Sequence, residues 1–132
     1  MPAKEPKELH TLFVTAFNAG DIEQILALYE KDAKFSLEDG AIIEGIAGIR
    51  EVVKGFLALK GKMVLQTHFA TEAGDIALLS GGWTLASTGP DFQPIEMNGI
   101  TVEVARRQAD GTWKYLIDYP YGTKTTEATV KA

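Results

Sequence analysis

Apolar residues recur with the period of an α-helix in the first part of the chain. One stripe predicts an amphipathic helix that begins near Pro6 and ends at Gly20, and its members are Leu9, Leu12, Phe13, Ala16 and Phe17. Asp21, with Gln24 three residues later, predicts the N-cap of a second, shorter helix, whose apolar positions extend to Tyr29. The chain therefore opens with two consecutive helices.

The pattern then predicts one more helix and six strands. Alternation over 33–37 and 41–44, around a Glu-Asp-Gly turn, predicts a short hairpin. A third helix is expected from Ile46 to a basic last turn at 60–61. The remainder is typical of long strands separated by turn residues, and these strands cover 63–73, 76–88, 95–108 and 113–119.

Helices that precede a meander of antiparallel strands are typical of the α+β class, with the helices packed on one face of the sheet. No internal repeat or linker divides the chain, so we expect a single domain over 1–122. Residues 123–132 are rich in Thr, Ala and Lys and show no periodicity, which predicts a flexible C-terminal tail.

Composition and charge mainly exclude classes of partner and of chemistry. The 45% hydrophobic and 23% charged residues are the balance of an ordinary globular domain. A net charge of −5, with Lys and Arg scattered, argues against a nucleic-acid partner. The lack of cysteine excludes disulfides and thiolate chemistry. The charged N-terminus and the lack of an apolar run of about 20 residues predict no membrane partner and a cytoplasmic location.

Histidines and glycines give no support for a metal or a cofactor. His10 lies beside the apolar stripe of the first helix and is expected to be exposed, while His68 is expected to be structural. Two distant histidines without cysteine predict no metal site. The glycine pair at 81–82 lies inside a predicted strand rather than before a helix, so no nucleotide or other cofactor is expected.

Short motifs in a defined order carry a family resemblance. They include Phe-Asn-Ala-Gly-Asp at 17–21, Gly-Ile-Ala-Gly-Ile-Arg at 45–50 and Arg-Arg-Gln-Ala-Asp-Gly-Thr-Trp-Lys at 106–114. With them the chain resembles the nuclear transport factor 2-like superfamily, and within it the SnoaL-like and ketosteroid isomerase-like proteins. The resemblance implies a cone-shaped, curved antiparallel sheet that is covered by three N-terminal helices and holds a pocket.

The resemblance does not imply one reaction, because the superfamily includes isomerases, cyclases, dehydratases and non-catalytic binding or assembly modules. An enzyme of this kind would be a cofactor-independent isomerase, cyclase or dehydratase that uses carboxyl acid–base chemistry.

Ketosteroid isomerases use an Asp base together with a Tyr and a protonated Asp that stabilise the oxyanion. By the resemblance, Phe13 stands at the place of the Tyr and Leu37 at that of the base. Glu38 and Asp39 follow as turn carboxylates, and Glu38 would act as a base only in a shifted hairpin register. Glu103 stands at the place of the protonated acid, so one of the three groups keeps its carboxyl.

Strand alternation places a second carboxyl beside Glu103. Thr101 and Glu103 share one face of their strand, and Asp118 is expected on the same face of the next. If this face is concave, burial and mutual repulsion keep one carboxyl protonated near neutral pH. We favour this orientation because the family register agrees with it. The alternative exposes both carboxyls and turns toward the helices Ile100, Val102, Val104, Trp113, Tyr115 and Ile117.

These placements define a predicted pocket of aromatic helix residues and small strand residues. Glu103 and Asp118 are the predicted catalytic or anchoring residues, and the predicted ligand-binding residues are Phe13, Phe17, Tyr29, Phe56, Met63, Ser80, Thr84 and Thr101. A conventionally filled core is the alternative, since small residues also accommodate bulky helix aromatics.

The sequence thus favours a protein that binds a small, compact, apolar molecule with a carbonyl or hydroxyl group, with acid–base proton transfer as the reaction open to it. The alternative is a non-catalytic binding or assembly module that forms a homodimer through the outer, convex sheet face. Phe92, in the loop 89–94, is expected to be exposed as a lid, a contact or simply a loop tip.

Overall fold

The computed structural model describes residues 2–89 and 91–122. The predicted tail at 123–132 lies outside the described residues. The predicted helices and strands are present, in the order α1 (Glu8–Asn18), α2 (Ile22–Leu26), β1 (Tyr29–Ser36), β2 (Ile42–Glu44), α3 (Ile46–Leu57), β3 (Lys62–Ala73), β4 (Ile76–Thr88), β5 (Pro94–Arg107) and β6 (Trp113–Tyr119).

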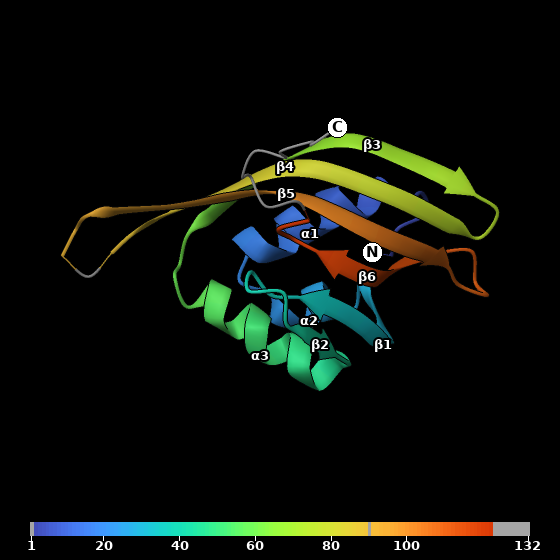
Figure 1. The fold of residues 1–132 in the computed structure, drawn as a ribbon, viewed down its shortest axis with the longest axis horizontal. Helices are drawn as coiled ribbons and strands as arrows, with labels where there is room; N and C mark the ends of the chain where they lie inside the picture. Colours follow the sequence, from blue (N-terminus) through green and yellow to red (C-terminus); the bar gives the residue numbers. More distant parts are fainter. Residues whose placement is uncertain (1, 90, 123–132) are drawn as a thin grey trace, which may run out of the picture.

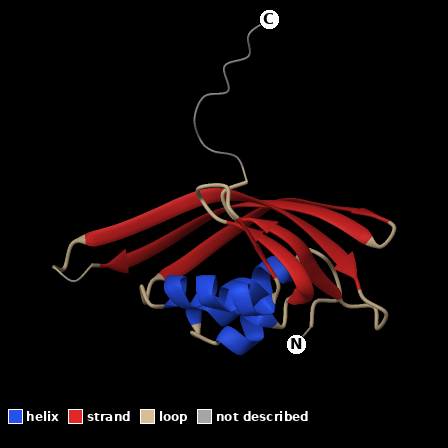
Figure 2. Cartoon of the chain, turned by 60° about the horizontal axis from the view of Figure 1, so that its bottom comes forward, coloured by secondary structure: helices blue, strands red, loops and turns tan. Residues whose placement is uncertain are grey.

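The strands form a single curved sheet in the order β2-β1-β6-β5-β4-β3. Strands β3 to β6 are the predicted antiparallel meander. The predicted hairpin of β1 and β2 joins its edge through a parallel pairing of β1 with β6, so the sheet is mixed. All three helices lie on the concave side, as Figures 1 and 2 show, which confirms the α+β fold class.

The junction between α1 and α2 is built as the sequence predicts, but α2 is shorter. Asp21 is confirmed as the N-cap, because its side chain accepts a hydrogen bond from the backbone N–H of Gln24 at 3.2 Å. The helix ends at Leu26, and Tyr29 begins β1, where it is paired with Tyr115. Placing Tyr29 in the helix was wrong, because pairing with the neighbouring strand overrides the local helical period there.

Register shifts interrupt the strand pairing at three places in the described sheet, one of them between Tyr29 and Lys34 of β1 and the other two at single extra residues. In β3, Thr67 is paired with Gly81 and Phe69 with Ser80, so His68 is an extra residue. In β6, Tyr115 is paired with Ala105 and Ile117 with Val104, which leaves Leu116 as the extra residue. Each extra residue reverses which face the following residues occupy.

The core lies between the helices and the concave face of the sheet. Its most completely buried large side chains come from both layers, and they are Leu9, Ile25, Ile49, Leu79, Leu85 and Tyr115. In the described part of the chain, none of the helices has the length and apolar character that crossing a bilayer requires.

Candidate functional site

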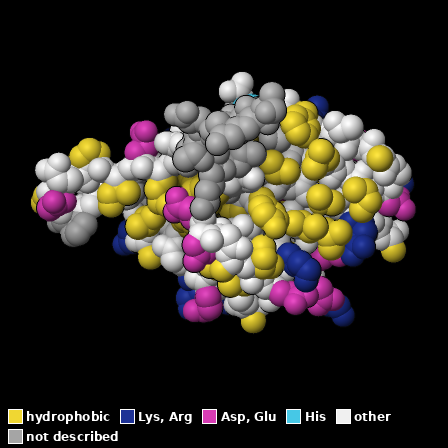
Figure 3. Space-filling view, viewed as in Figure 1, with side chains coloured by type: hydrophobic (Ala, Val, Ile, Leu, Met, Phe, Trp, Pro, Cys, Tyr) yellow, Lys and Arg dark blue, Asp and Glu magenta, His cyan; other side chains and the backbone are white. Residues whose placement is uncertain are grey.

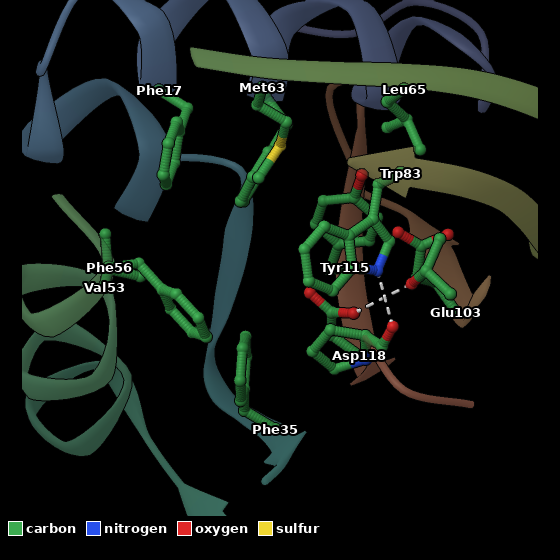
Figure 4. Close-up of a pocket in the computed structure, with 13 residues that line it drawn as sticks. Phe17, Phe35, Val53, Phe56, Met63, Leu65, Trp83, Glu103, Tyr115 and Asp118 are labelled. Atoms are coloured by element: carbon green, nitrogen blue, oxygen red, sulfur yellow. Dashed lines mark hydrogen bonds between the residues drawn. The ribbon is translucent and has the colours of Figure 1, made fainter. Parts of the chain in front are cut away.

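A cavity of about 60 Å³ opens between α1, α3 and the concave face of the sheet. Its wall is mostly aromatic and aliphatic, and its lining includes Phe13, Phe17, Phe35, Val53, Phe56, Met63, Leu65 and Trp83. Its polar end is formed by Thr101, Glu103, Tyr115 and Asp118 from β5 and β6, with Pro120 beside them. Figure 4 shows the two carboxyls together at this end, across from Phe56 and Met63.

Glu103 and Asp118 are directly paired across β5 and β6. Both are nearly inaccessible, with 4% and 5% of their surface exposed, so the favoured concave orientation is confirmed and the solvent-facing alternative is wrong. Side chains directly opposite each other in an antiparallel pair are close neighbours, and two like charges there would be destabilising. One of the two carboxyls must therefore be neutral.

The structure favours Asp118 as the neutral carboxyl. Burial and the nearby charge of Glu103 raise its pKa from 3.8 to about 8, against the opposing effect of hydrogen bonds from Tyr29 and Thr101. The Tyr29 hydroxyl donates to Asp118 Oδ2 at 2.5 Å, whereas Thr101 Oγ1 lies 3.4 Å from Oδ1. Oδ1, whose contact with Thr101 is the longer one, is thus the oxygen better placed to carry the proton.

Glu103 is paired with His10, whose predicted exposure is wrong. His10 was expected to be exposed, but only 2% of it is exposed, and its Nε2 lies 2.7 Å from Glu103 Oε1. Its Nδ1 lies 2.8 Å from the hydroxyl of Thr67 on β3. A position beside the apolar stripe faces the sheet here, because the sheet curves around α1 and supplies polar partners. Among the described residues, Asp118 has the hydroxyls of Tyr29 and Thr101 as side-chain partners and no imidazole, which distinguishes it from Glu103.

Two tyrosines surround the carboxyl pair. Burial, followed by the charges of the two carboxyls, raises the pKa of both Tyr29 and Tyr115 well above the usual value, so both remain protonated donors. Tyr115 lines the cavity, but Tyr29 does not. Tyr29 lies behind Asp118 and holds it in place, so its predicted position on the cavity wall is wrong.

The predicted cavity positions of Ser80 and Thr84 are also wrong. On β4, Gly81 is paired with Thr101 and Leu79 with Glu103, so the odd-numbered residues face the cavity side. Ser80 lies on the convex face and donates its hydroxyl to Thr101 O at 2.8 Å. A buried sheet face is filled by large side chains. On β4 the large apolar side chains stand at alternate, odd-numbered positions, and this missed pattern indicates the cavity side; they are Leu79, Trp83 and Leu85.

The other predicted lining residues have the expected places. Phe13, Phe17, Phe56, Met63 and Thr101 all border the cavity.

The two turn carboxylates after β1 lie away from the polar end. Asp39 is exposed and accepts a hydrogen bond from Ala41 N at 2.9 Å, and Glu38 is exposed beside it. Their role is that of turn residues. Leu37, at the position of the isomerase base, is half-buried and carries no acid–base group.

The convex face of the sheet carries a continuous apolar surface, which we call the outer apolar face. Its residues are Val64, Phe69, Leu78, Ile100, Val102, Val104, Ile117 and Tyr119. Hydrophobic side chains gather over the strands in Figure 3. Strict alternation, with Asp118 on the concave face, would also place Trp113 and Tyr115 on this convex face. Both are instead buried on the concave side, because the bulge at Leu116 lets Tyr115 and Asp118 share one face.

Among residues 2–89 and 91–122, no three His, Cys, Asp or Glu side chains come together as metal ligands. The polar end of the cavity is therefore an arrangement of hydrogen-bond donors and acceptors: a neutral carboxyl, a histidine-bound carboxyl, a tyrosine and a threonine.

Solved structures share this fold. A ketosteroid isomerase-like protein from Erwinia carotovora atroseptica is similar with a TM-score of 0.76 and 17% identity, over 86% of this chain and 90% of that chain. An NTF2-like protein with a cystatin-like fold from Novosphingobium aromaticivorans gives a TM-score of 0.78 and 17% identity, over 94% and 82%. A conserved protein from Planctomyces limnophilus gives a TM-score of 0.77 and 13% identity, over 86% and 89%. At these identities the likeness shows the fold alone.

No curated protein matches the sequence. The family described as the SnoaL-like domain, in contrast, matches residues 11–115, which extend from α1 to β6 and include most of the cavity. This match covers most of the chain and agrees with the motifs at 17–21, 45–50 and 106–114. The chain therefore belongs to the SnoaL-like domain family, with the α+β fold of NTF2-like proteins.

Proposed function

We propose that the cavity binds a compact, uncharged, largely apolar molecule that carries a carbonyl or hydroxyl group. The observation that supports this most directly is the pair of buried carboxyls at one end of an apolar cavity, one of them neutral and the other bound to His10. A neutral Asp118 donates a hydrogen bond to a carbonyl oxygen, and Glu103 accepts one from a hydroxyl. No Lys or Arg lies among the described lining residues, so a carboxylate ligand would lack an ionic partner.

The size of the cavity limits this ligand. About 60 Å³ holds a few water-sized molecules, so a ring-sized ligand requires movement of side chains at the wall. Phe56, Met63 and Leu65 are only half-buried, and such side chains change rotamer most readily. A compact ligand is therefore favoured over a steroid-sized one.

The same pair can support acid–base proton transfer. In the proposed reaction, the Glu103 carboxylate takes a proton from a carbon next to the ligand carbonyl. Asp118 donates a hydrogen bond to the oxygen that becomes negative, and Glu103 then returns its proton to another carbon of the ligand. The net result is an isomerisation without a cofactor. Phe13 and Leu37 offer no hydroxyl and no second base, so the carboxyl pair must carry both roles.

Binding is tested by thermal shift with a panel of small ketones, enones, phenols and aromatic acids. We expect shifts with the uncharged compounds, loss of these shifts in Asp118→Leu, and their retention in Asp118→Asn, which keeps a donor. Asp32→Asn, an exposed position on β1, is the matched control for the substitution itself. No shift with any compound at high concentration would remove the support for binding.

Catalysis is tested separately, by deuterium uptake from D₂O into a bound ketone. Glu103→Gln is expected to lower the uptake rate by about 100-fold or more. Glu96→Gln, on the exposed part of the same strand, is expected to leave it unchanged. Equal uptake in Glu103→Gln and wild type would contradict the catalytic role and leave a binding protein.

A second candidate function is a homodimeric assembly module, and it is favoured by the outer apolar face. Val64, Phe69, Leu78, Ile100 and Tyr119 are exposed there as one surface, and surfaces of this kind mark interaction sites. Sedimentation is expected to give a dimer for wild type and a monomer for Ile100→Lys. Ile42→Lys, an exposed apolar position on β2 at the edge of the sheet, is the control. A wild-type monomer at micromolar concentration would reject this function.

A further inference from the structure

His10 connects the buried carboxyl of Glu103 to the molecular surface. The histidine lies in the first turn of α1, and its ring is enclosed between the helix and the sheet. Its Nε2 lies 2.7 Å from Glu103 Oε1, and its Nδ1 lies 2.8 Å from Thr67 Oγ1. Thr67 is exposed to solvent at the bulge of β3. A continuous chain of hydrogen bonds therefore joins Glu103, which is 4% exposed, to a threonine that is exposed to solvent.

We propose that His10 and Thr67 form a proton relay between Glu103 and solvent, on a route separate from the mouth of the cavity. Neither residue lines the cavity, whereas Glu103 does. The inference rests on the proposed function only for the role of Glu103 as the base whose proton the relay exchanges with solvent.

The geometry satisfies every partner before and after a transfer. With Glu103 ionised, Nε2–H donates to the carboxylate and Nδ1 accepts from the Thr67 hydroxyl. With Glu103 protonated, its hydroxyl donates to Nε2 and Nδ1–H donates to Thr67 Oγ1. In the step between them, the Glu103 proton moves to Nε2, the Nδ1 proton moves to Thr67, and the Thr67 proton leaves to a water molecule. One proton leaves Glu103 and one reaches solvent, and both hydrogen bonds persist with their direction reversed.

Such a route matters because the cavity is apolar and its ligand would exclude water from Glu103. A base enclosed in this way exchanges its proton with solvent only along a path of proton carriers, and imidazole is the side chain best suited to pass a proton through its two nitrogens. The other titratable groups around Glu103 do not offer this path. Asp118 is buried and holds its own proton, and Tyr29 and Tyr115 are buried donors whose pKa values lie well above the usual range.

The relay is tested on ligand-free protein, by NMR of the ring N–H of His10 in protein with ¹⁵N-labelled histidine. The exchange rate of this proton with water is compared between wild type and Thr67→Val, which keeps the shape of the side chain and removes the hydroxyl. We expect exchange to slow by at least about tenfold in Thr67→Val and to return in Thr67→Ser. Thr71→Val, on the convex side of the same strand, is the matched control and is expected to have no effect.

The sign of the change separates a relay from a merely structural contact. Loosening of the His10 ring would make its proton exchange faster, whereas loss of a relay makes it slower. Unchanged or faster exchange in Thr67→Val, or equal slowing in Thr71→Val, would overturn the proposal. Because no ligand is present, these outcomes are independent of whether the cavity binds a ketone or catalyses a reaction.

Discussion

Each face of the sheet carries side chains that the usual distribution of polarity would place on the other face. The concave face, which the helices cover, holds two carboxyls, a histidine contact and two tyrosines, all nearly inaccessible to solvent. The convex face exposes the outer apolar face. A protein selected for stability alone would bury the apolar residues and expose the acids. Each of these placements therefore points to a function. The buried carboxyls of the concave face indicate ligand chemistry, and the exposed apolar side chains of the convex face indicate assembly.

One extra residue in each of β3 and β6 determines which side chains lie on which face. The bulge at Leu116 lets Tyr115 and Asp118 both face the cavity although their positions are an odd number, three, apart in the chain. The bulge at His68 lets Thr67 face His10 while Phe69 faces outward. Perfect alternation would place one member of each pair on the wrong side.

The most damaging test of this arrangement is deletion of Leu116. Without the extra residue, either Trp113 and Tyr115 or Asp118 must turn to the convex face. We expect a loss of more than about 4 kcal/mol in the free energy of unfolding, a large share of the roughly 5 to 15 kcal/mol that stabilises a typical domain. Urea denaturation measures it. Leu116→Ala, which keeps the bulge, is the control and is expected to cost much less. Similar stability of the deletion and the control would refute the role of the bulge.

Removing His10 is expected to have the next largest effect. His10→Ala leaves the buried Glu103 without its hydrogen-bond partner, and a buried carboxylate left without a partner costs about 3 to 5 kcal/mol. His68→Ala, the exposed histidine, is the control and is expected to change stability by less than about 0.5 kcal/mol. Adding Glu103→Gln to His10→Ala should recover part of the loss, since no charge then remains unpaired. Full additivity of the two substitutions in denaturation experiments would contradict a coupled pair.

Most of the fold follows from local patterns that tertiary contacts do not change. The stripe of α1, the cap at Asp21 and the turns between β3, β4, β5 and β6 are each specified by neighbouring residues, and the structure agrees with them. The parallel pairing of β1 with β6 depends on segments far apart in the sequence, and no periodicity encodes it. The predicted end of α2 was wrong for the same reason, because Tyr29 pairs with Tyr115 of β6 and begins a strand.

The site was only partly predictable because it depends on strand register. Glu103 and Asp118 were found through alternation and resemblance, and the structure places them together. Ser80 and Thr84 were assigned to the wrong face of β4. The register of a strand is set by its pairing with neighbouring strands, and the sequence of one strand alone does not reveal that pairing. His10 was missed since its partners, Thr67 and Glu103, are 57 and 93 residues away.

The pH dependence of stability distinguishes the neutral carboxyl from its charged neighbour. The pKa of Asp118 is raised from 3.8 to about 8, so the folded state binds one proton more than the unfolded state between these values. Stability conferred by this proton is therefore lost as pH rises through the window, with a slope of at most about 1.4 kcal/mol per pH unit. Asp118→Asn is expected to flatten the slope in urea denaturation from pH 5 to 8. A wild-type slope that the substitution does not change would contradict a protonated Asp118.

The smallest expected effect comes from Leu78 on β4, and its comparison with the adjacent Leu79 tests the contrast of the faces directly. Leu79 is completely buried, and Leu79→Ala is expected to cost about 2 to 5 kcal/mol. Leu78 is 44% exposed on the outer apolar face, and Leu78→Ala in a monomer should cost less than about 1 kcal/mol. If the outer apolar face forms a homodimer, the cost at Leu78 grows with protein concentration, because dissociation is then part of unfolding. Denaturation at two concentrations measures this, and a concentration-independent cost at Leu78 would leave the convex face without a partner of its own kind.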